Sequence, residues 1–323
     1  MSNEYAIEIN NLVKKYDDLH AVDGISFKIK CGEIFAFLGP NGAGKTTTVE
    51  IIEGVRKATS GEVKVLGNNV NNKRALTRIK RIIGTLPQEF STHWELTVYE
   101  NIRYWAKLYR TSLSIDYLIQ LVKLGDKRNT RYKNLSGGLK RRLGIAIALV
   151  NDPQIVFLDE PTTGLDPRAR RDTWEIIRGL QEEGKTIFLT THYMEEAQIL
   201  ADRVAIIHKG KIMAIGTPTE LIDKYGGENK VIIRTSSAES RDKIYQLLLE
   251  MGPLEDAEGD IVISSKRGTI SKIIDLLEDN NLSYLDIITH RPTLEEVFLT
   301  LTGETIQSAH QIEPSKSTKE WRV

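Results

Sequence analysis

Residues 39–47 read Gly39-Pro-Asn-Gly-Ala-Gly-Lys-Thr-Thr47, and this stretch decides the fold. It fits the pattern Gly-x-x-x-x-Gly-Lys-Thr of a phosphate-binding loop, with Gly39, Gly44, Lys45 and Thr46 at the diagnostic positions. The glycines allow consecutive backbone N–H groups to turn towards phosphate oxygens without a Cβ in the way. In such loops the lysine reaches the β- and γ-phosphates, and the threonine hydroxyl ligates Mg²⁺. The loop therefore predicts a site for a magnesium nucleotide.

The residues on both sides of this loop agree with that prediction. Residues 33–38 form a continuous apolar run, which is typical of a strand buried on both faces. Residues 47–53 have the pattern of a helix whose N-terminus would face the phosphates. We expect every residue of the loop to contact the nucleotide: Gly39, Pro40, Asn41, Gly42, Ala43, Gly44, Lys45, Thr46 and Thr47.

The composition bounds the class of protein. With 323 residues the chain is long enough for two domains. Its 44 Lys and Arg residues balance 44 Asp and Glu residues, so no net charge draws it to nucleic acid or to anionic lipid. A single cysteine, Cys31, excludes an internal disulfide. No apolar run approaches the ~20 residues that span a bilayer, so we expect a soluble chain whose membrane role, if any, needs a separate partner.

Two further buried strands are predicted to end in chemically useful groups. Residues 155–160 are apolar up to Asp159 and Glu160, and residues 186–191 lead directly to His192. Ligands of parallel α/β sheets bind at the carboxyl ends of the strands, which favours functional roles for these side chains. An aspartate at such a strand end suits a grip on Mg²⁺, and the neighbouring glutamate suits polarising a water molecule aimed at the γ-phosphate.

Three weaker signals need support from elsewhere in the chain. Tyr16, shortly before Val22, has an aromatic ring that could stack on a purine or pack as an ordinary side chain. Gln88 follows a strand predicted at residues 82–87 and suits either the Mg²⁺ shell or an ordinary loop. Residues 135–139 open a helix with Ser136 as its N-cap, where glycines permit close approach to an anion.

The remaining N-terminal segments have simpler interpretations. Residues 6–10 and 25–29 alternate apolar and polar side chains, as do strands with one solvated face. Residues 68–81 are polar and carry five basic side chains, which we interpret as a solvated face. Residues 94–124 have a helical pattern rich in aromatic residues, which predicts a helical insert within about residues 90–150. Those aromatic residues either pack within the insert or form an exposed patch for a partner.

In this order the motifs strongly resemble those of the ATP-binding subunits of ABC transporters, and the match covers residues 5 to about 222. The resemblance implies a P-loop NTPase fold, with a RecA-like α/β core, an antiparallel β subdomain and a helical subdomain. It implies that Tyr16 stacks on adenine, that Gln88 senses Mg²⁺ and couples to the permease, and that His192 is the switch histidine. It also implies that Asp159 is the Walker B aspartate.

The same resemblance assigns the other candidate residues. Ser136, Gly137 and Gly138 are similar to the signature motif, Glu160 to the catalytic glutamate and Asp166 to the D-loop aspartate. The expected catalytic residues are Glu160, His192, Lys45 and Gln88, and the expected Mg²⁺ ligands are Thr46, Gln88 and Asp159. Besides the phosphate-binding loop, the expected ATP contacts are Tyr16, Val22, Ser136, Gly137, Gly138 and Asp166.

The signature departs from the family's commonest form at Leu139, where glutamine is usual. Leucine cannot hydrogen-bond a ribose, whereas Ser136 and the glycine backbone can still bind a γ-phosphate. This form is similar to subunits that serve drug, antibiotic and polysaccharide exporters whose permease is a separate chain. Residues 291–303 also resemble the C-terminal motif of that exporter group, so the resemblance favours export over import.

Beyond the matched region the chain predicts a second domain. Residues 231–247 have a strand and helix pattern that recurs at residues 261–277, which indicates a small α+β domain, for which a ferredoxin-like arrangement is one candidate. Thr293 and Glu296 predict a capping box for a last helix. The expected division is an ATP-binding domain at residues 1–224, a linker at 225–230, an accessory domain at 231–303 and a flexible tail at 304–323.

The resemblance implies a mechanism and partners. Two copies face each other head to tail, and each MgATP lies between the phosphate-binding loop of one copy and the signature of the other. The expected protein is a homodimeric ATPase at the cytoplasmic face of the membrane, bound to a separate permease and not to nucleic acid. The alternatives are a soluble ABC ATPase acting on DNA or ribosomes, a P-loop GTPase or small-molecule kinase, and a regulatory nucleotide sensor.

Overall fold

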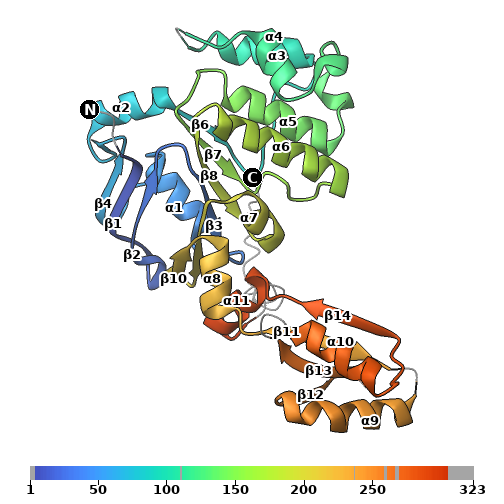
Figure 1. The fold of residues 1–323 in the computed structure, drawn as a ribbon. Coiled ribbons are helices and arrows are strands. Elements are labelled where there is room, and N and C mark those ends of the chain that lie inside the picture. Colours follow the sequence, from blue (N-terminus) through green and yellow to red (C-terminus); the bar gives the residue numbers. More distant parts are fainter. Residues whose placement is uncertain (1–3, 110, 236, 258–259, 266–268, 305–323) are drawn as a thin grey trace, which may run out of the picture. The chain divides into compact units, whose positions relative to one another are not determined.

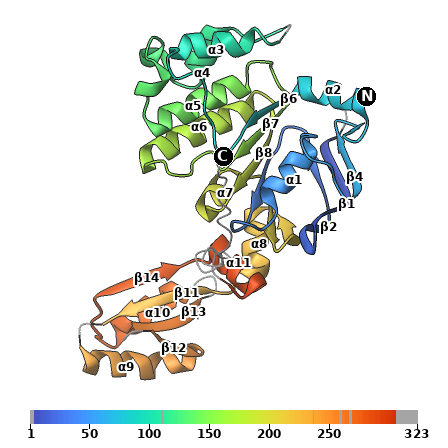
Figure 2. The ribbon, with the colours of Figure 1, turned by 180° about the vertical axis from the view of Figure 1, so that it is seen from behind.

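The computed structural model describes residues 4–109, 111–235, 237–257, 260–265 and 269–304 (Figures 1 and 2). The described part of the chain divides into two compact units, one of residues 4–220 with 302–304 and the other within residues 221–301. No helix among the described residues is both long enough and apolar enough to cross a membrane.

A six-stranded sheet forms the centre of the first unit, in the order β10-β9-β3-β8-β7-β6. Its strands are β3 (Ile34–Leu38), β6 (Ile83–Leu86), β7 (Ile155–Asp159), β8 (Thr186–Thr191), β9 (Arg203–His208) and β10 (Lys211–Gly216). All neighbours pair in parallel except β10, which pairs antiparallel with β9. Every residue of β3, β7 and β8 is buried, which explains their continuous apolar runs.

A four-stranded antiparallel sheet packs against the same core, in the order β2-β1-β4-β5. It contains β1 (Tyr5–Tyr16), β2 (Leu19–Lys30), β4 (Ser60–Val65) and β5 (Asn68–Asn69). The first two strands are much longer than the stretches 6–10 and 25–29 that alternation predicts. Register shifts between Ile9 and Tyr16 break the alternation while the ladder continues, so the sequence pattern underestimates the strands.

Eight α-helices complete the described part of this unit, and the last of them leads out of it. They are α1 (Lys45–Ile52), α2 (Lys73–Ile82), α3 (Val98–Ala106), α4 (Ile115–Leu121), α5 (Gly137–Ala148), α6 (Pro167–Glu182), α7 (Met194–Leu200) and α8 (Pro218–Tyr225). The polar segment 68–81 is mostly helix α2, and the helical pattern at 94–124 is two short helices separated by a loop. In both views α5 and α6 lie side by side, next to the strands β6 to β8 (Figures 1 and 2).

The hydrophobic core between the two sheets holds the nucleotide-binding loop in place. Phe27 of β2 stacks on Phe35 and Phe37 of β3, with ring centroids 5.3 and 5.6 Å apart. Helix α1 contributes Val49, Ile51 and Ile52 to the same core. The loop at residues 39–44 joins β3 to α1, so both of its ends are fixed by buried packing.

The second unit has the strand order β12-β13-β11-β14, and all of its pairs are antiparallel. Its elements are β11 (Asn229–Arg234), α9 (Ala238–Leu248), β12 (Leu254–Ala257), β13 (Asp260–Ser265), α10 (Thr269–Asp279) and β14 (Asp286–His290). The succession β-α-β-β-α-β with this strand order is the ferredoxin-like arrangement. The residues expected as a linker, 225–230, already contain the end of α8 and the start of β11, because Asn229 and Lys230 pair with β13.

The last helix, α11 (Leu294–Thr302), begins at the predicted cap. The Thr293 backbone N–H donates to Glu296 Oε2 at 2.8 Å, so the glutamate satisfies a backbone donor at the helix start. Leu294, Val297 and Phe298 are buried, as their spacing on one helix face predicts. The expected tail, apart from Glu304, lies outside the described residues.

Candidate functional site

The phosphate-binding loop needs glycine at two positions because backbone oxygens lie against it. An added Cβ on Gly39 would lie 2.3 Å from the Ile207 carbonyl oxygen, and one on Gly44 would lie 2.3 Å from the Ala21 carbonyl oxygen. Gly44 also has a φ of 103°, in the region that favours glycine. The loop is therefore wedged between β9 and the start of β2, and its backbone amides at the N-terminus of α1 form an anion-binding cradle.

Lys45, the first residue of α1, is buried inside this loop. Its Nζ donates to the carbonyl oxygens of Gly39 at 2.8 Å and Pro40 at 3.1 Å, so the loop curls around the ammonium group. Burial lowers the Lys45 pKa, while the charges of Glu160 and Asp159 oppose that shift. Lys45 Nζ also lies 3.5 Å from Glu160 Oε1, which joins the loop to the end of β7.

A hydroxyl and a carboxylate suited to Mg²⁺ meet beside the loop. Thr46 Oγ1 donates to Asp159 Oδ2 at 3.4 Å, and the other Asp159 oxygen accepts a hydrogen bond from the Thr190 hydroxyl. No cluster of three His, Cys, Asp or Glu side chains able to hold a metal occurs in the described ranges. Two protein ligands next to a phosphate cradle fit Mg²⁺, which keeps waters and substrate phosphates in its coordination shell.

Glu160 is the meeting point of the candidate catalytic groups. Gln88 Nε2 and Thr163 Oγ1 both donate to its Oε2 atom, each at 3.1 Å. On the other oxygen, His192 Nδ1 lies 3.1 Å from Oε1, next to Lys45. The structure therefore brings together the four residues that the sequence marks as catalytic, which come from three strand ends and one helix start.

The environment of Glu160 keeps its carboxylate ionised. Burial alone would raise its pKa, but the hydrogen bond from His192 and the charge of Lys45 outweigh burial and hold the pKa at about 2. The backbone is strained as well, because Glu160 has a φ of 48° although it carries a side chain. Its N–H is bonded to the Thr190 carbonyl oxygen at 3.1 Å, so strand β8 fixes this conformation. A strained residue held by its neighbours is typical of functional sites.

Arg141, which no motif in the sequence marks, holds the backbone of this site together. Its guanidinium donates to the carbonyl oxygens of Gln88 at 2.9 Å and of Glu160 at 2.8 Å. It also donates to the carbonyl oxygens of Pro87, Asp159 and Pro161. Burial lowers the Arg141 pKa to about 10, which leaves it charged at neutral pH. A signal was available, because Arg141 shares the buried face of α5 with Gly144, Ile145 and Ala148 at helical spacing.

Tyr16 and Val22, the expected adenine contacts, lie in different environments. The Tyr16 ring ends β1 and is partly exposed, with Lys14 Nζ 4.9 Å and the Arg56 guanidinium 5.3 Å from its centroid. Val22 is fully buried in the hydrophobic core, so its side chain offers no surface to a ligand. The segment between them reaches the site through Ala21, whose carbonyl oxygen lies against Gly44.

The signature residues lie at the N-terminus of α5. Ser136 caps the helix by accepting a hydrogen bond from the Leu139 N–H at 3.4 Å, and both Ser136 and Gly137 are exposed. Gly138 is a close-approach position, because an added Cβ would lie 2.8 Å from Ala169 Cβ on α6. Asp166 caps α6 by accepting from the Ala169 N–H at 3.0 Å. In this single chain Ser136, Gly137 and Asp166 are exposed to solvent.

Comparison with known proteins agrees with this geometry. A family profile described as "ABC transporter" matches residues 22–163. The linearmycin resistance ATP-binding protein LnrL of Bacillus subtilis is 33% identical over 93% of this chain and 99% of its own length. The Nod factor export ATP-binding protein I of Rhizobium meliloti is 37% identical over 94% of this chain and 89% of its own length.

Solved structures show the same likeness. A dimeric ATP-binding cassette bound to ADP and phosphate, in a post-hydrolysis state, has a TM-score of 0.59 and 29% identity over 65% of this chain and 98% of its own. The structure of cbiO1 from Clostridium perfringens, described as part of an ABC transporter complex, has a TM-score of 0.62 and 26% identity. That match covers 77% of this chain and 96% of cbiO1.

Proposed function

The chain belongs to the ATP-binding subunits of ABC transporters and is an ATPase of that family, and from this premise we propose that it drives a separate permease for export. The observation that carries the proposal is the arrangement around Glu160, where Lys45 and groups from two neighbouring strand ends meet the ionised carboxylate that follows a third strand. The export direction rests on the relatives, which are named for drug resistance and for Nod factor export.

Some residues of the site bind the nucleotide and the metal ion, and others act on the attacking water. The backbone amides at Gly39–Thr47 and the Lys45 ammonium bind the phosphates of ATP, while Thr46 and Asp159 hold Mg²⁺, with Gln88 as a further candidate ligand. When bound, the metal ion neutralises the charge that builds up on the transferring phosphoryl group. Glu160, ionised at neutral pH, accepts a hydrogen bond from the attacking water and polarises it. His192 keeps the Glu160 carboxylate oriented.

The second half of each site comes from another copy of the chain. Ser136 caps the twelve-residue helix α5, whose N-terminus carries the positive end of the helix dipole and faces solvent. A γ-phosphate bound to one copy would be stabilised by this helix end of the other copy. A dimer of this kind agrees with the solved cassette dimer that contains ADP and phosphate.

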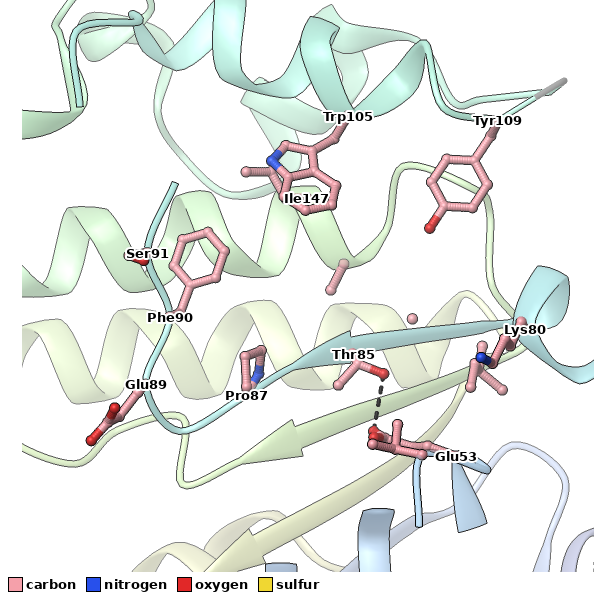
Figure 3. A pocket seen from close by; sticks show the side chains of 14 residues that line it. Glu53, Lys80, Thr85, Pro87, Glu89, Phe90, Ser91, Trp105, Tyr109 and Ile147 are labelled. Carbon is pink, nitrogen blue, oxygen red and sulfur yellow. Dashed lines mark hydrogen bonds between the residues drawn. The ribbon is translucent and has the colours of Figure 1, made fainter. Parts of the chain in front are cut away.

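A groove next to Gln88 provides the site for the permease (Figure 3). It has a volume of about 430 Å³ and lies between β6 on one side and Trp105 and Tyr109 of the α3 region on the other. Val55, which also lines it, is 69% exposed, so the groove offers apolar surface beside its aromatic residues. We assign this groove to an amphipathic helix of the permease, which would hold the protein at the cytoplasmic face of the membrane.

The groove is mechanically connected to the catalytic carboxylate. Pro87 and Glu89 line it, and Gln88 between them donates to Glu160. A helix that enters or leaves the groove would therefore move the partner of Glu160. The same groove also contains aromatic residues of the helical insert, so the interpretation of the aromatic residues as a partner surface is the one we propose.

The test of this function uses the chain with and without its permease. Glu160→Gln is expected to bind ATP normally, to lose turnover by about two to four orders of magnitude, and to accumulate as ATP-bound dimers. Co-expression with a candidate permease, such as a membrane protein encoded next to this gene, should give a detergent-stable complex whose ATPase exceeds that of the free chain. Undiminished turnover of the variant would remove Glu160 from its role, and a chain that never associates with a membrane protein would contradict the transporter assignment.

A further inference from the structure

Helix α2 carries a dense group of basic side chains that the ATPase site does not use. Within its ten residues, Lys73–Ile82, it has five basic residues and no acidic residue. The five are exposed: Lys73, Arg74, Arg78, Lys80 and Arg81. None of them takes part in a salt bridge within the described residues. We call these five side chains the basic face of α2.

The helix presents this face rigidly. Ile79 is fully buried, and Leu76 packs so closely on Gly54 that an added Cβ there would lie 2.1 Å from Leu76 Cδ1. Asn72 caps the helix by accepting hydrogen bonds from the backbone N–H groups of Arg74 and Ala75. The apolar side is thus fixed to the end of α1, and the opposite side points to solvent.

Helix stability explains only part of these charges, because Lys80 and Arg81 lie in the last turn, where positive charge is favourable next to the negative end of the helix dipole. Lys73 and Arg74 lie in the first turn, where positive charge is unfavourable next to the positive end of the helix dipole. Five like charges on so short a helix also repel one another. The chain as a whole has no net charge, so the positive potential is local to this helix. The sequence alone favours a solvated face, but it does not show that the charges are concentrated on one side and lack acidic partners.

The position of the helix indicates what the basic face meets. Lys80 belongs both to this face and to the lining of the groove that we assign to the permease (Figure 3). A protein embedded in the membrane and seated in this groove would bring the adjacent helix α2 close to the bilayer surface. The chemistry found there is the phosphate of anionic lipid headgroups, which arginine and lysine bind.

We propose that the basic face of α2 binds anionic phospholipid headgroups beside the docked permease. Its placement next to the membrane rests on the proposed function, whereas the attraction itself needs only the side chains of this helix. Each basic residue close to an anionic surface contributes roughly fivefold to partitioning, so five of them are enough for weak, reversible and salt-sensitive binding.

The test is flotation of the purified full-length chain with phosphatidylcholine vesicles, with and without phosphatidylglycerol. The variant R74Q/R78Q/R81Q removes three charges and leaves Lys80 in the groove unchanged. The matched control K127Q/K224Q/K272Q removes three charges from exposed positions elsewhere. We expect the wild type and the control to bind only the anionic vesicles, and the α2 variant to bind them at least tenfold more weakly.

Several outcomes would overturn the proposal. They are equal binding of the two triple variants, equal binding to neutral and anionic vesicles, or a wild type that binds duplex DNA but not anionic vesicles. ATPase turnover and co-purification with the permease are measured on the same variants. If these stay normal while vesicle binding is absent, only the lipid proposal fails; if they are absent in the wild type, the proposed function fails.

Discussion

The side-chain amide of Gln88 donates a 3.1 Å hydrogen bond to the carboxylate of Glu160, across 72 residues of sequence. Gln88 follows β6 at the edge of the groove, and Glu160 follows β7 at the centre of the site. Because β6 and β7 are adjacent parallel strands, their carboxyl ends lie together at one edge of the sheet. This bond connects the segment between the groove-lining residues Pro87 and Glu89 to the group that we assign to catalysis.

Replacing Gln88 by alanine should uncouple the groove from the site. We expect turnover of the permease complex to fall roughly tenfold, since a hydrogen bond to a charged group contributes about 1.5–3 kcal/mol. The affinity for ATP should change little, because Lys45 and the loop amides remain. Steady-state ATPase assays with and without the permease measure both effects. The control is Glu89→Ala, an exposed neighbour in the same groove, and equal effects of the two changes would contradict a specific role for Gln88.

The low pKa of Glu160 predicts the acid limit of turnover. A carboxylate with a pKa of about 2 stays ionised down to strongly acidic pH, so its protonation should not limit turnover between about pH 5 and pH 8. His192→Ala removes a hydrogen bond that lowers this pKa, and the acid limb of kcat should therefore move to higher pH. The pH profiles of the two proteins provide the measurement. A variant with lower kcat and an unshifted acid limb would show that His192 does not set the ionisation of Glu160.

The free energy of unfolding should also depend on pH, in the direction that the lowered pKa of Glu160 dictates. The folded-state pKa of Glu160 is depressed below its ordinary value of 4.5, so its contribution to stability is present above that value and is lost as the pH falls towards 2. Glu53 behaves in the opposite way, because burial raises its pKa.

Glu53→Gln should stabilise the protein at alkaline pH. Burial raises the pKa of Glu53 to about 7, while Thr85 Oγ1 donates to its Oε1 at 3.0 Å (Figure 3). A raised pKa gives a contribution to stability that is complete below 4.5 and is lost as the pH rises through 7. Glutamine can keep the bond to Thr85 without a charge, so the free energy of unfolding should rise by about 1–3 kcal/mol at pH 8 and hardly at pH 4.

Denaturant titrations at both pH values measure this difference. The control is Glu89→Gln, an exposed carboxylate in the same groove, for which no pH-dependent gain is expected. If Glu53→Gln changed stability equally at pH 4 and pH 8, the carboxylate of Glu53 would not have a raised pKa in the folded protein.

The amino-acid sequence predicted the parts of the site that repeat a short local pattern. The loop at residues 39–47, the carboxylates that end β7 and the cap at Ser136 can each be recognised within a few residues. The ferredoxin-like unit was visible as a repeated strand and helix pattern. The lengths of the strands were harder to predict, because the register shifts in β1 interrupt the alternation on which the prediction depends.

Contacts between distant segments were not predictable from local patterns. Arg141 binds five carbonyl oxygens that belong to the segments 87–88 and 159–161, and nothing near Arg141 in the sequence marks those partners. The positions of the Gln88 amide and the Glu160 carboxylate likewise depend on which strands are adjacent in the sheet, and their sequence order does not give that adjacency.

Replacing Arg141 should therefore damage the site more than replacing the arginine next to it. Arg141→Met leaves several buried carbonyl oxygens without a donor, and each such loss costs about 1–3 kcal/mol where water cannot enter. We expect the free energy of unfolding to fall by about 2–5 kcal/mol and turnover to fall more than the affinity for ATP, because the backbone at Gln88 and Glu160 loses its shared support.

The matched control is Arg142→Met, since Arg142 is the next residue on the same helix and makes a long 4.0 Å ion pair with Asp172. Urea titrations and ATPase assays compare the two variants. A third variant, Arg141→Lys, replaces the planar guanidinium group, which reaches two segments at once, by a single ammonium group. Equal stability and turnover in Arg141→Met and Arg142→Met would show that the five hydrogen bonds of Arg141 do not support the site.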